Sequence, residues 1–214
     1  MDLFEAARAA QRADAPESCR GPLDGLSDET MLVPSFPYGC AVCEVEVDPE
    51  TGVVEVARYT TVDDCGRAVN PMILHGQAHG GIAQGVGQAL WESCVYDAET
   101  GQPLSSTLMD YALPRADMLP SFMTELSEVP STSHPLGLRG GGEGGTTPAL
   151  GVVVNAICDA LAELGVEHIE MPATAERVWQ AIRHAQQRRQ DAQARSISGF
   201  RCASSVTGAP GATT

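Results

Sequence analysis

The stretch "CAVCEVEVDPETGVVEVARYTTVDD", residues 40–64, decides the fold of this chain. Each half alternates apolar and polar residues, which is the pattern of a strand with one buried face. The two halves are joined by Asp-Pro-Glu-Thr-Gly, a combination typical of tight turns. We therefore predict a β-hairpin in which Cys43, Val45 and Val47 face the core while the intervening glutamates face water.

Two residue pairs in and after this hairpin raise the question of a metal site. Cys40 and Cys43 form a CxxC pair, but residues at i and i+3 of a strand point to opposite faces, and no second CxxC is present. His75 and His79 are four residues apart, and no third ligand is evident beside them. We interpret Cys40 and Cys43 as strand cysteines. The seven scattered cysteines, an odd number, also argue against a disulfide framework.

Three helices are predicted beyond the hairpin. The first covers residues of about 74–93 and the second about 148–164, with Thr147 as its N-cap and a proline at its first position. The third covers about 175–186 and is capped by Thr174. All three carry apolar residues at helical spacing, so each should bury one face.

The remaining segments complete the predicted architecture. Residues 95–104 resemble a second hairpin, and residues 122–130 read as a further strand. The sum is an α+β fold of antiparallel β-hairpins packed with helices. We divide the chain into an N-terminal helix with an irregular lead-in (1–35), a folded lobe (36–186) and a disordered tail (187–214), which loses periodicity and fills with Gln, Ser, Gly and Thr.

Composition limits the classes of function. The chain has 28 acidic and 13 basic residues and a formal net charge of −15. Binding to nucleic acid or to an anionic membrane needs clustered Lys and Arg, so neither is expected as a partner. No run of about 18 apolar residues is present, and the N-terminus is too acidic for a signal peptide. We therefore expect a cytoplasmic protein.

The predicted helix at 74–93 contains an unusual number of glycines. They are Gly76, Gly80, Gly81, Gly85 and Gly87. Each interior glycine costs about 0.8–1 kcal/mol relative to alanine, so the set costs on the order of 4 kcal/mol. Close approach of another backbone or of a ligand would offset this cost, and both explanations stay open. Gln77, Gln84 and Gln88 would frame the bare face with amide donors and acceptors.

A glycine-rich loop, "RGGGEGGTT" at residues 139–147, isolates a single carboxylate, Glu143. Glycine permits positive φ and close approach of the main chain to a bound group, and the following helix would direct its free N–H groups toward the loop. The loop is a candidate cradle for an anion or a cofactor, although it matches no dinucleotide or nucleotide fingerprint. Glu143 fits a general base, which needs a short reach and a rigid seat. The alternative is a solvated glutamate in a flexible surface loop.

Five segments, in this order over about residues 36–183, carry a resemblance to a known family. They are "FPYGCAVCEVEVDPETGVVEVARYTTVDDCGRAVNP", "GQAHGGIAQGVGQALWE", "MDYALPRADMLPSF", "HPLGLRGGGEGGT" and "VVNAICDAL" with the later "HIEMPATAERVWQAI". Their succession resembles the C-terminal part of the large, molybdopterin-binding subunit of molybdenum hydroxylases. This is the family of xanthine dehydrogenase, aldehyde oxidase and aerobic carbon monoxide dehydrogenase.

The resemblance implies a role for each matching residue. Gly142-Glu143 matches a Gly-Glu pair whose glutamate is the family's catalytic base and takes a proton from the hydroxyl group on molybdenum. Gly76-Gln77 matches a Gly-Gln pair whose glutamine contacts the pyranopterin cofactor. The other matching positions would lie around that cofactor: Gly80, Gly81, Gln84, Gly144 and Thr146. None of these residues is expected to bind the metal directly.

The resemblance also implies cofactors and partners. The family's oxidoreductases use a molybdopterin-type molybdenum cofactor, in some members in the cytosine dinucleotide form, with iron–sulfur and FAD groups on partner subunits. Upstream family segments that supply much of the pterin pocket are not in this sequence. We therefore expect a partial large subunit that hydroxylates an aldehyde, a heterocycle or carbon monoxide only together with a chain carrying the upstream lobe. A truncated non-catalytic remnant and an unrelated small-ligand binding module stay open as alternatives.

Overall fold

The computed structural model describes residues 2–22, 24–26, 28, 33–133 and 135–203, without the side chains of 195–203. The chain divides into two compact units, Met1–Pro34 and Ser35–Thr214. The second unit holds the sheet, the core and the candidate site. Within the described ranges, no helix is long and apolar enough to span a bilayer.

Helix α1 (Leu3–Ala10) is the main element of the first unit. Its N-cap is Asp2, whose side chain accepts a hydrogen bond from the Glu5 backbone N–H at 2.7 Å. The Glu5 side chain in turn accepts one from the Asp2 backbone N–H at 2.9 Å. This reciprocal capping box fixes the start of the helix. A single 3-10 turn, η1 (Glu17–Cys19), follows in the same unit.

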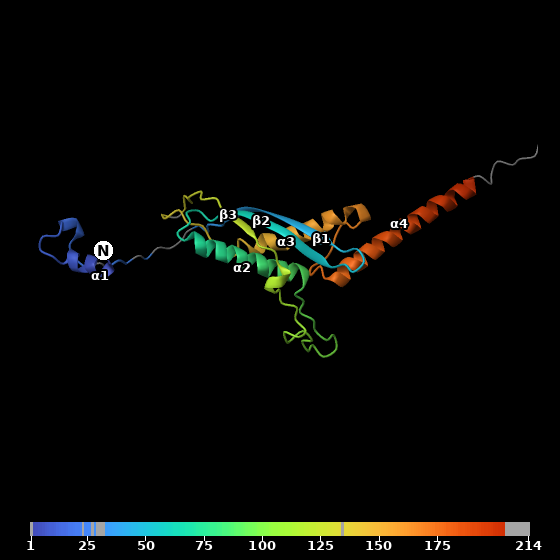
Figure 1. Ribbon diagram of the computed structural model, residues 1–214, viewed down its shortest axis with the longest axis horizontal. Coiled ribbons are helices and arrows are strands. Elements are labelled where there is room, and N and C mark those ends of the chain that lie inside the picture. The colour runs from blue at the N-terminus through green and yellow to red at the C-terminus, as the bar shows by residue number, and fades with distance from the viewer. Residues whose placement is uncertain (1, 23, 27, 29–32, 134, 204–214) are drawn as a thin grey trace, which may run out of the picture. The chain divides into compact units, whose positions relative to one another are not determined.

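One sheet of three strands, in the order β1-β2-β3, forms the second unit's frame (Figure 1). Strands β1 (Tyr38–Val47) and β2 (Val54–Asp64) are antiparallel and make the predicted hairpin. Strand β3 (Met123–Leu126) pairs with β2 in parallel. The α+β class is thus correct, but the prediction of antiparallel pairing throughout was wrong for β3. The chain crosses over through helix α2 between these strands, and a crossover connection is what joins parallel strands.

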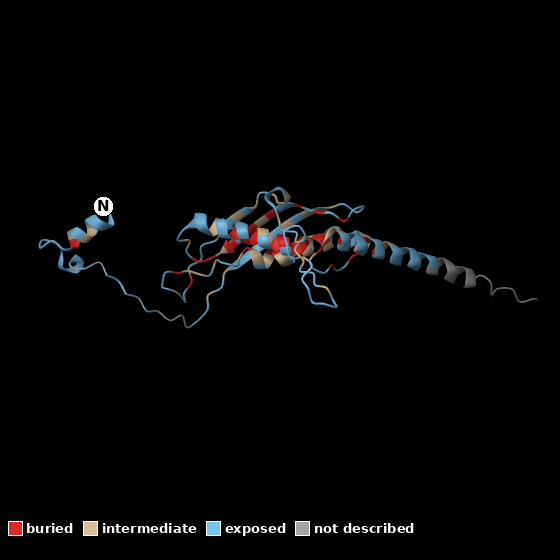
Figure 2. Ribbon diagram, turned by 90° about the horizontal axis from the view of Figure 1, so that it is seen from below, coloured by how far each residue is buried: buried red, intermediate tan, exposed pale blue. Residues whose placement is uncertain are grey.

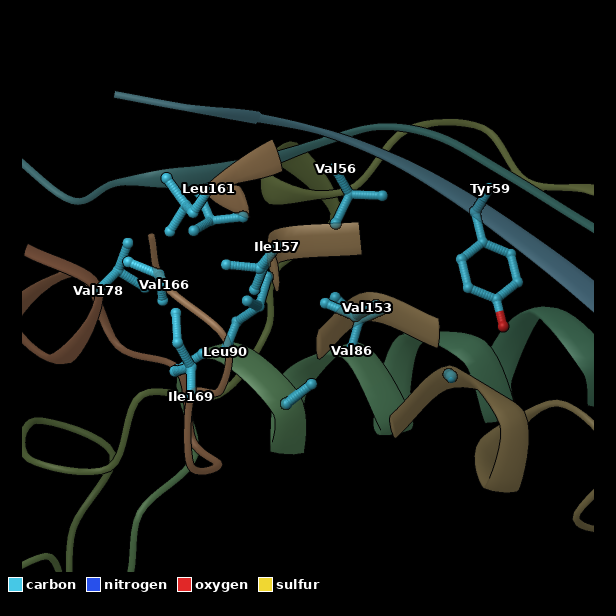
Figure 3. Packing of buried hydrophobic residues seen from close by; sticks show 14 of the residues in the cluster. Val56, Tyr59, Val86, Leu90, Val153, Ile157, Leu161, Val166, Ile169 and Val178 are labelled. Carbon is cyan, nitrogen blue, oxygen red and sulfur yellow. The ribbon is translucent and has the colours of Figure 1, made fainter. Parts of the chain in front are cut away.

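Two helices cover the inner face of the sheet, α2 (Pro71–Leu90) and α3 (Thr146–Ala160). The hairpin residues Cys43, Val45 and Val47 pack against the core, and the glutamates between them are exposed, as predicted. Buried residues gather where the helices meet the sheet (Figure 2). Figure 3 shows side chains of this core between the strands and helix α2.

Helices α2 and α3 approach each other closely because glycine lines their contact. A Cβ at Gly85 would lie 2.6 Å from the Ala149 Cβ and 2.7 Å from the Thr146 carbonyl oxygen. A Cβ at Gly81 would lie 2.9 Å from the Thr146 backbone nitrogen. The loop residue Gly145 is pressed in the same way against the α2 backbone. Backbone atoms cannot move aside as a flexible side chain can, so these positions require glycine for packing.

Several helix boundaries differ from the predicted ones. Helix α2 begins at Pro71 rather than about 74, because Asn70 caps it by accepting from the Ile73 N–H at 3.3 Å. Helix α3 begins at Thr146 with Gly145 as N-cap, so the prediction of Thr147 as N-cap was wrong. The Thr147 N–H already bonds to a loop carbonyl in the first turn. The helix ends at Ala160, and a 3-10 turn, η3 (Ala162–Leu164), completes the predicted range.

The C-terminal helix α4 (Ala175–Ala203) is longer than predicted. Its first turns add Val178, Ile182 and Ala185 to the core, and Thr174 caps it as expected by accepting from a backbone N–H at 3.4 Å. The prediction of disorder from 187 was wrong as far as residue 203. Ala, Gln and Arg are favourable helix formers, and Gln187 bonds Asp191 one turn on at 3.0 Å. Residues 204–214 of the predicted tail lie outside the described residues.

The segment between α2 and β3 is mostly irregular. The predicted hairpin at 95–104 is reduced to one antiparallel bridge between Tyr96 and Pro103. The Asp97 side chain closes the turn by accepting from the Thr100 N–H at 2.7 Å, but proline has no N–H with which to extend a ladder. A 3-10 turn, η2 (Ala116–Met118), precedes β3.

We expect Gly85→Ala to lower the free energy of unfolding by roughly 1–3 kcal/mol, the usual cost of overpacking. Gly80→Ala is the matched control, because Gly80 is exposed on the same helix and its added Cβ would meet nothing within 4 Å. That change should stabilise the chain by about 0.5–1 kcal/mol. Urea unfolding of the two variants measures both effects. Equal stabilisation by both would contradict the close contact of α2 and α3.

Candidate functional site

The glycine loop is tied to the sheet at its N-terminal side by Arg139. The Arg139 backbone N–H donates to the Cys65 carbonyl oxygen at 2.9 Å. Its guanidinium lies 4.9 Å from the centre of the Tyr38 ring and its Nε lies 3.7 Å from the Asp64 carboxylate. The side chains of Asp64 and Arg139 are only 13% and 15% exposed, so this ion pair is weakly screened. The entry to the loop is therefore fixed to the end of the hairpin.

Gln77 of α2 joins the two predicted parts of the site. Its side-chain Nε2 donates to the Gly142 carbonyl oxygen at 2.8 Å, across 65 residues of sequence. On the far side of Glu143, Gly145 packs against the α2 backbone at Ala78. Glu143 therefore stands between two fixed points, one on each side. The backbone on both sides of this glutamate is therefore held against α2.

The loop glycines act by leaving space and not by adopting positive φ. Gly137, before the loop, has φ of 72°, and no glycine from 140 to 145 has a positive φ. The positive φ that glycine permits is therefore not used in this loop. A Cβ at Gly141 would lie 2.9 Å from the Leu74 side chain, whereas at Gly142 and Gly144 it would meet nothing within 4 Å. Close approach explains Gly141 and Gly145, and open surface remains at Gly142 and Gly144.

The predicted cofactor residues fall into two groups. Four glycines present open surface with nothing within 4 Å of an added Cβ: Gly76, Gly80, Gly142 and Gly144. The side chains of Gln77 and Gln84 are exposed on the same helix as the first two. Gly81 and Thr146 instead contact each other in the packing of α2 on α3. The first group leaves space open on α2 and on the loop, and the second group belongs to the packing of α2 on α3.

Glu143 lines a cavity of about 640 Å³. The walls come from the start of β1 and the segment before it, from β2, from the loop and from the start of α3: Ser35, Phe36, Pro37, Tyr38, Gly39, Asp63, Gly140, Gly142, Gly144, Thr147 and Pro148. The Glu143 side chain is itself exposed. The candidate base thus faces a pocket next to the Gln77 segment, but this chain alone does not shield it from water.

A second carboxylate, Asp63 of β2, lines the same cavity and was missed by sequence reasoning. It is 5% exposed, and its Oδ2 accepts a hydrogen bond from the Thr61 hydroxyl at 3.2 Å. Burial raises the pKa of Asp63, and the Thr61 bond opposes that rise. The alternation of residues in β2 could have identified Asp63 as a site residue. It places Asp63 on the inner face of the sheet with Tyr59, where an acidic residue is rarely found.

Of the two residue pairs that raised the question of a metal, the histidine pair has a structural role. His75 Nδ1 lies 2.7 Å and His79 Nε2 lies 3.3 Å from the same Thr124 Oγ1, so both histidines tie α2 to β3. Cys40 is exposed and Cys43 half-buried, and burial raises the pKa of Cys43 to about 11. Across the described part of the chain, no group of three or more His, Cys, Asp or Glu side chains is placed to hold a metal ion.

A comparison with known families identifies the site's context. The model of the molybdopterin cofactor-binding domain matches residues 3–120. The chain belongs to the molybdopterin cofactor-binding family. The matched range contains the glycine helix α2 with Gly76, Gln77 and Gln84, and it ends before Glu143. The family resemblance seen in the sequence is confirmed.

Relatives of this molybdopterin-binding chain agree with that assignment. It is 39% identical over 149 residues to the carbon monoxide dehydrogenase large chain of Hydrogenophaga pseudoflava, covering 70% of this chain and 18% of the relative. It is 39% identical over 150 residues to the nicotine 6-hydroxylase large subunit of Paenarthrobacter nicotinovorans, covering 70% and 18%. A crystal structure of Cu,Mo-CO dehydrogenase superposes with a TM-score of 0.67 at 37% identity, covering 70% of this chain and 19% of that one. The chain therefore spans less than a fifth of these relatives.

We expect Asp63→Asn to stabilise the molybdopterin-binding chain at neutral pH. Because the folded pKa of Asp63 is raised, ionising this carboxyl costs folding stability as pH rises from its ordinary value of 3.8 through the raised value. The melting temperature of the variant should match wild type near pH 3.5 and exceed it at pH 7.

Asp48→Asn is the control of opposite sign. Hydrogen bonds from the Thr51 hydroxyl and the Glu50 N–H lower the pKa of Asp48, so its contribution is present above pH 3.8 and lost as pH falls. This variant should melt below wild type at pH 7 and approach it in acid. An Asp63→Asn chain that is less stable than wild type at pH 7 would contradict the assigned burial of that carboxylate.

Proposed function

We propose that this chain is part of a molybdenum hydroxylase large subunit. It contributes the catalytic base and one wall of the molybdopterin pocket to the oxidative hydroxylation of an aldehyde, a heterocycle or carbon monoxide. The observation that carries the proposal is the 2.8 Å hydrogen bond from Gln77 to the Gly142 carbonyl. It brings the segment expected to contact the pterin beside the segment expected to hold the base.

The residues present fit one side of a flat, polar cofactor. Gly76, Gly80, Gly142 and Gly144 leave open the space that a Cβ would fill, and the exposed amides of the neighbouring glutamines can donate and accept hydrogen bonds. These residues would hold the pterin, while the contact between Gly81 and Thr146 fixes the helices beneath. When bound, the molybdenum cofactor supplies the two-electron oxidation and the oxygen that enters the product.

Glu143 has the properties that a general base needs. Its carboxylate oxygens would accept the proton released during hydroxylation, and the anchors at Gly142 and Gly145 hold its backbone in place. The side chain is exposed in this chain, so the upstream lobe would have to exclude water from it. This requirement is the physical reason to propose that turnover depends on a second chain.

The remaining parts of the proposal follow from the family. Relatives are named as a large chain, a large subunit and a subunit gamma, which are parts of multi-subunit enzymes. We propose iron–sulfur and flavin subunits as electron-accepting partners and a cytosine dinucleotide form of the cofactor. We also propose a cytoplasmic location, where the free thiols of the six described cysteines would stay reduced.

Glu143→Gln should lower kcat of the complex purified through a tag on this chain by about 100-fold to 10,000-fold, the usual contribution of a general base. Molybdenum content should stay unchanged, because Glu143 is not assigned to cofactor binding. Glu50→Gln, in the exposed hairpin turn, is the control and should keep full turnover. Full turnover by Glu143→Gln would refute the base, and a wild-type complex without molybdenum would favour a non-catalytic remnant.

Gln77→Ala should reduce molybdenum retention by roughly two- to tenfold, as expected for loss of a hydrogen bond worth about 0.5–1.5 kcal/mol. The control is Gln180→Ala, an exposed glutamine of helix α4 that does not line the cavity. Metal analysis of the purified complexes after dialysis gives the comparison. Equal retention by both variants would argue against a cofactor contact at Gln77.

A further inference from the structure

Strand β1 forms a long, regular edge of the sheet. Within the described residues it has a strand partner, β2, on one side only. The strand is 10 residues long, and alternate N–H and C=O groups point away from β2. Proteins usually protect such edges with proline, lysine or a bulge. β1 contains neither proline nor lysine, and the register shift after Glu44 places the extra residue, Ala57, in β2.

The outer face of the sheet changes character along its length. At the end near the cavity this face carries one exposed carboxylate of β3, Glu125, which stands opposite Val62 in the register. Four large apolar side chains are exposed there as well: Tyr38 and Val42 of β1, Val62 of β2 and Met123 of β3, with exposed fractions of 65%, 59%, 40% and 59%. We call these four residues the outer patch. The solvated face of an antiparallel sheet commonly carries polar residues. The outer patch therefore behaves as a surface that another element covers.

Beyond the register shift the same face is acidic. Glu44 is compensated by Arg58 at 3.1 Å. Glu46, however, stands directly opposite Glu55 in the strand register, and both are exposed. Like charges directly opposite each other destabilise a strand pair. A Lys or Arg side chain arriving next to the β1 edge would remove this repulsion.

These charges decide which occupant fits. A second copy of this chain would bring its own Glu44 and Glu46 and a further net charge of −15 to the edge, so self-pairing adds repulsion. The missing part of the large subunit is the better candidate, because this chain spans only 18–19% of its relatives. The outer patch also continues into the cavity through Tyr38, which belongs to both.

We propose that an extended segment of a partner chain carrying the upstream molybdopterin-binding lobe adds as a strand to the free edge of β1. Its apolar side chains cover the outer patch, and a Lys or Arg beside them pairs with Glu46 and Glu55. The added strand supplies the missing main-chain hydrogen bonds, as in other cases of strand addition to a sheet edge. The identity of the partner rests on the proposed function, whereas the strand addition itself rests on the edge and the outer patch.

Amide hydrogen exchange of the full chain tests the proposal. Exchange along Tyr38–Val47 is compared between the chain alone and the complex purified through its tag, with the partner identified by mass spectrometry. We expect about half of the β1 amides, those facing the free edge, to exchange at least roughly tenfold more slowly in the complex. Unchanged β1 exchange in a complex that contains the upstream lobe would overturn the proposal. Protection of β1 in a homodimer, or by a partner chain without the upstream lobe, would also overturn it.

Variants separate this proposal from the assigned catalysis. Val42→Lys places a charge in the outer patch and should reduce recovery of the partner by about tenfold. Val53→Lys is the matched control, because Val53 is 53% exposed in the hairpin turn, outside the patch, and partner recovery should stay at the wild-type level. Circular dichroism checks that both variants fold. Equal recovery by both would count against the outer patch.

The Glu143→Gln complex distinguishes the two failures. Strand addition does not involve Glu143, so β1 in that complex should be protected as in wild type whether or not turnover is lost. Full turnover together with protection of β1 would refute Glu143 as the base and support strand addition at β1. Loss of turnover without protection of β1 would support the base and refute strand addition.

Discussion

The close contact of helices α2 and α3 is the constraint on which the rest of this structure depends. Gly81 and Gly85 let the α3 backbone lie against α2, and Gly145 extends the same contact into the loop. Gln77 lies one turn before Gly81. The contact between α2 and α3 therefore brings the Gln77 amide within hydrogen-bond distance of the Gly142 carbonyl oxygen. Any side chain in this contact would separate the two helices, and the candidate site would come apart with them.

The glycines of α2 show how local cost and function are related. Five of them cost the helix on the order of 4 kcal/mol relative to alanine. Packing explains Gly81 and Gly85 against α3, and Gly87 against Pro114. Nothing in the described chain approaches Gly76 or Gly80 in the same way. About 2 kcal/mol of that cost therefore has no compensation inside this chain, and an uncompensated local cost is typical of a binding surface.

Three features of the second unit lack a partner within the described residues. Glu143 has a fixed backbone but an exposed side chain, Gly76 and Gly80 face open space, and β1 has one free edge. Under the proposed function, the groups that shield Glu143, hold the cofactor and pair β1 would come from a second chain. The small share of its relatives that this chain covers agrees with that interpretation.

Short-range chemistry in the sequence determined much of this protein. The alternation at 40–64 determined the hairpin and its buried face, and the ordered motifs determined the family. The helix boundaries and the parallel pairing of β3 were harder to predict from the sequence. The start of α2 depends on capping by Asn70, and the direction of β3 depends on the crossover that precedes it. Helix α4 was misjudged at its C-terminal end, where a polar composition with no apolar face forms a helix as readily as it forms coil.

Tertiary structure alone decided what the glycines do and which carboxylates meet. Sequence left close packing and a ligand face as alternatives for α2. The structure shows that Gly81 and Gly85 serve close packing, whereas the space beside Gly76 and Gly80 is open. It also brought Asp63 to the cavity of Glu143, 80 residues further along the chain. Such contacts depend on how two helices and a sheet edge are placed in space, and side-chain order along one strand or one helix carries no record of that placement.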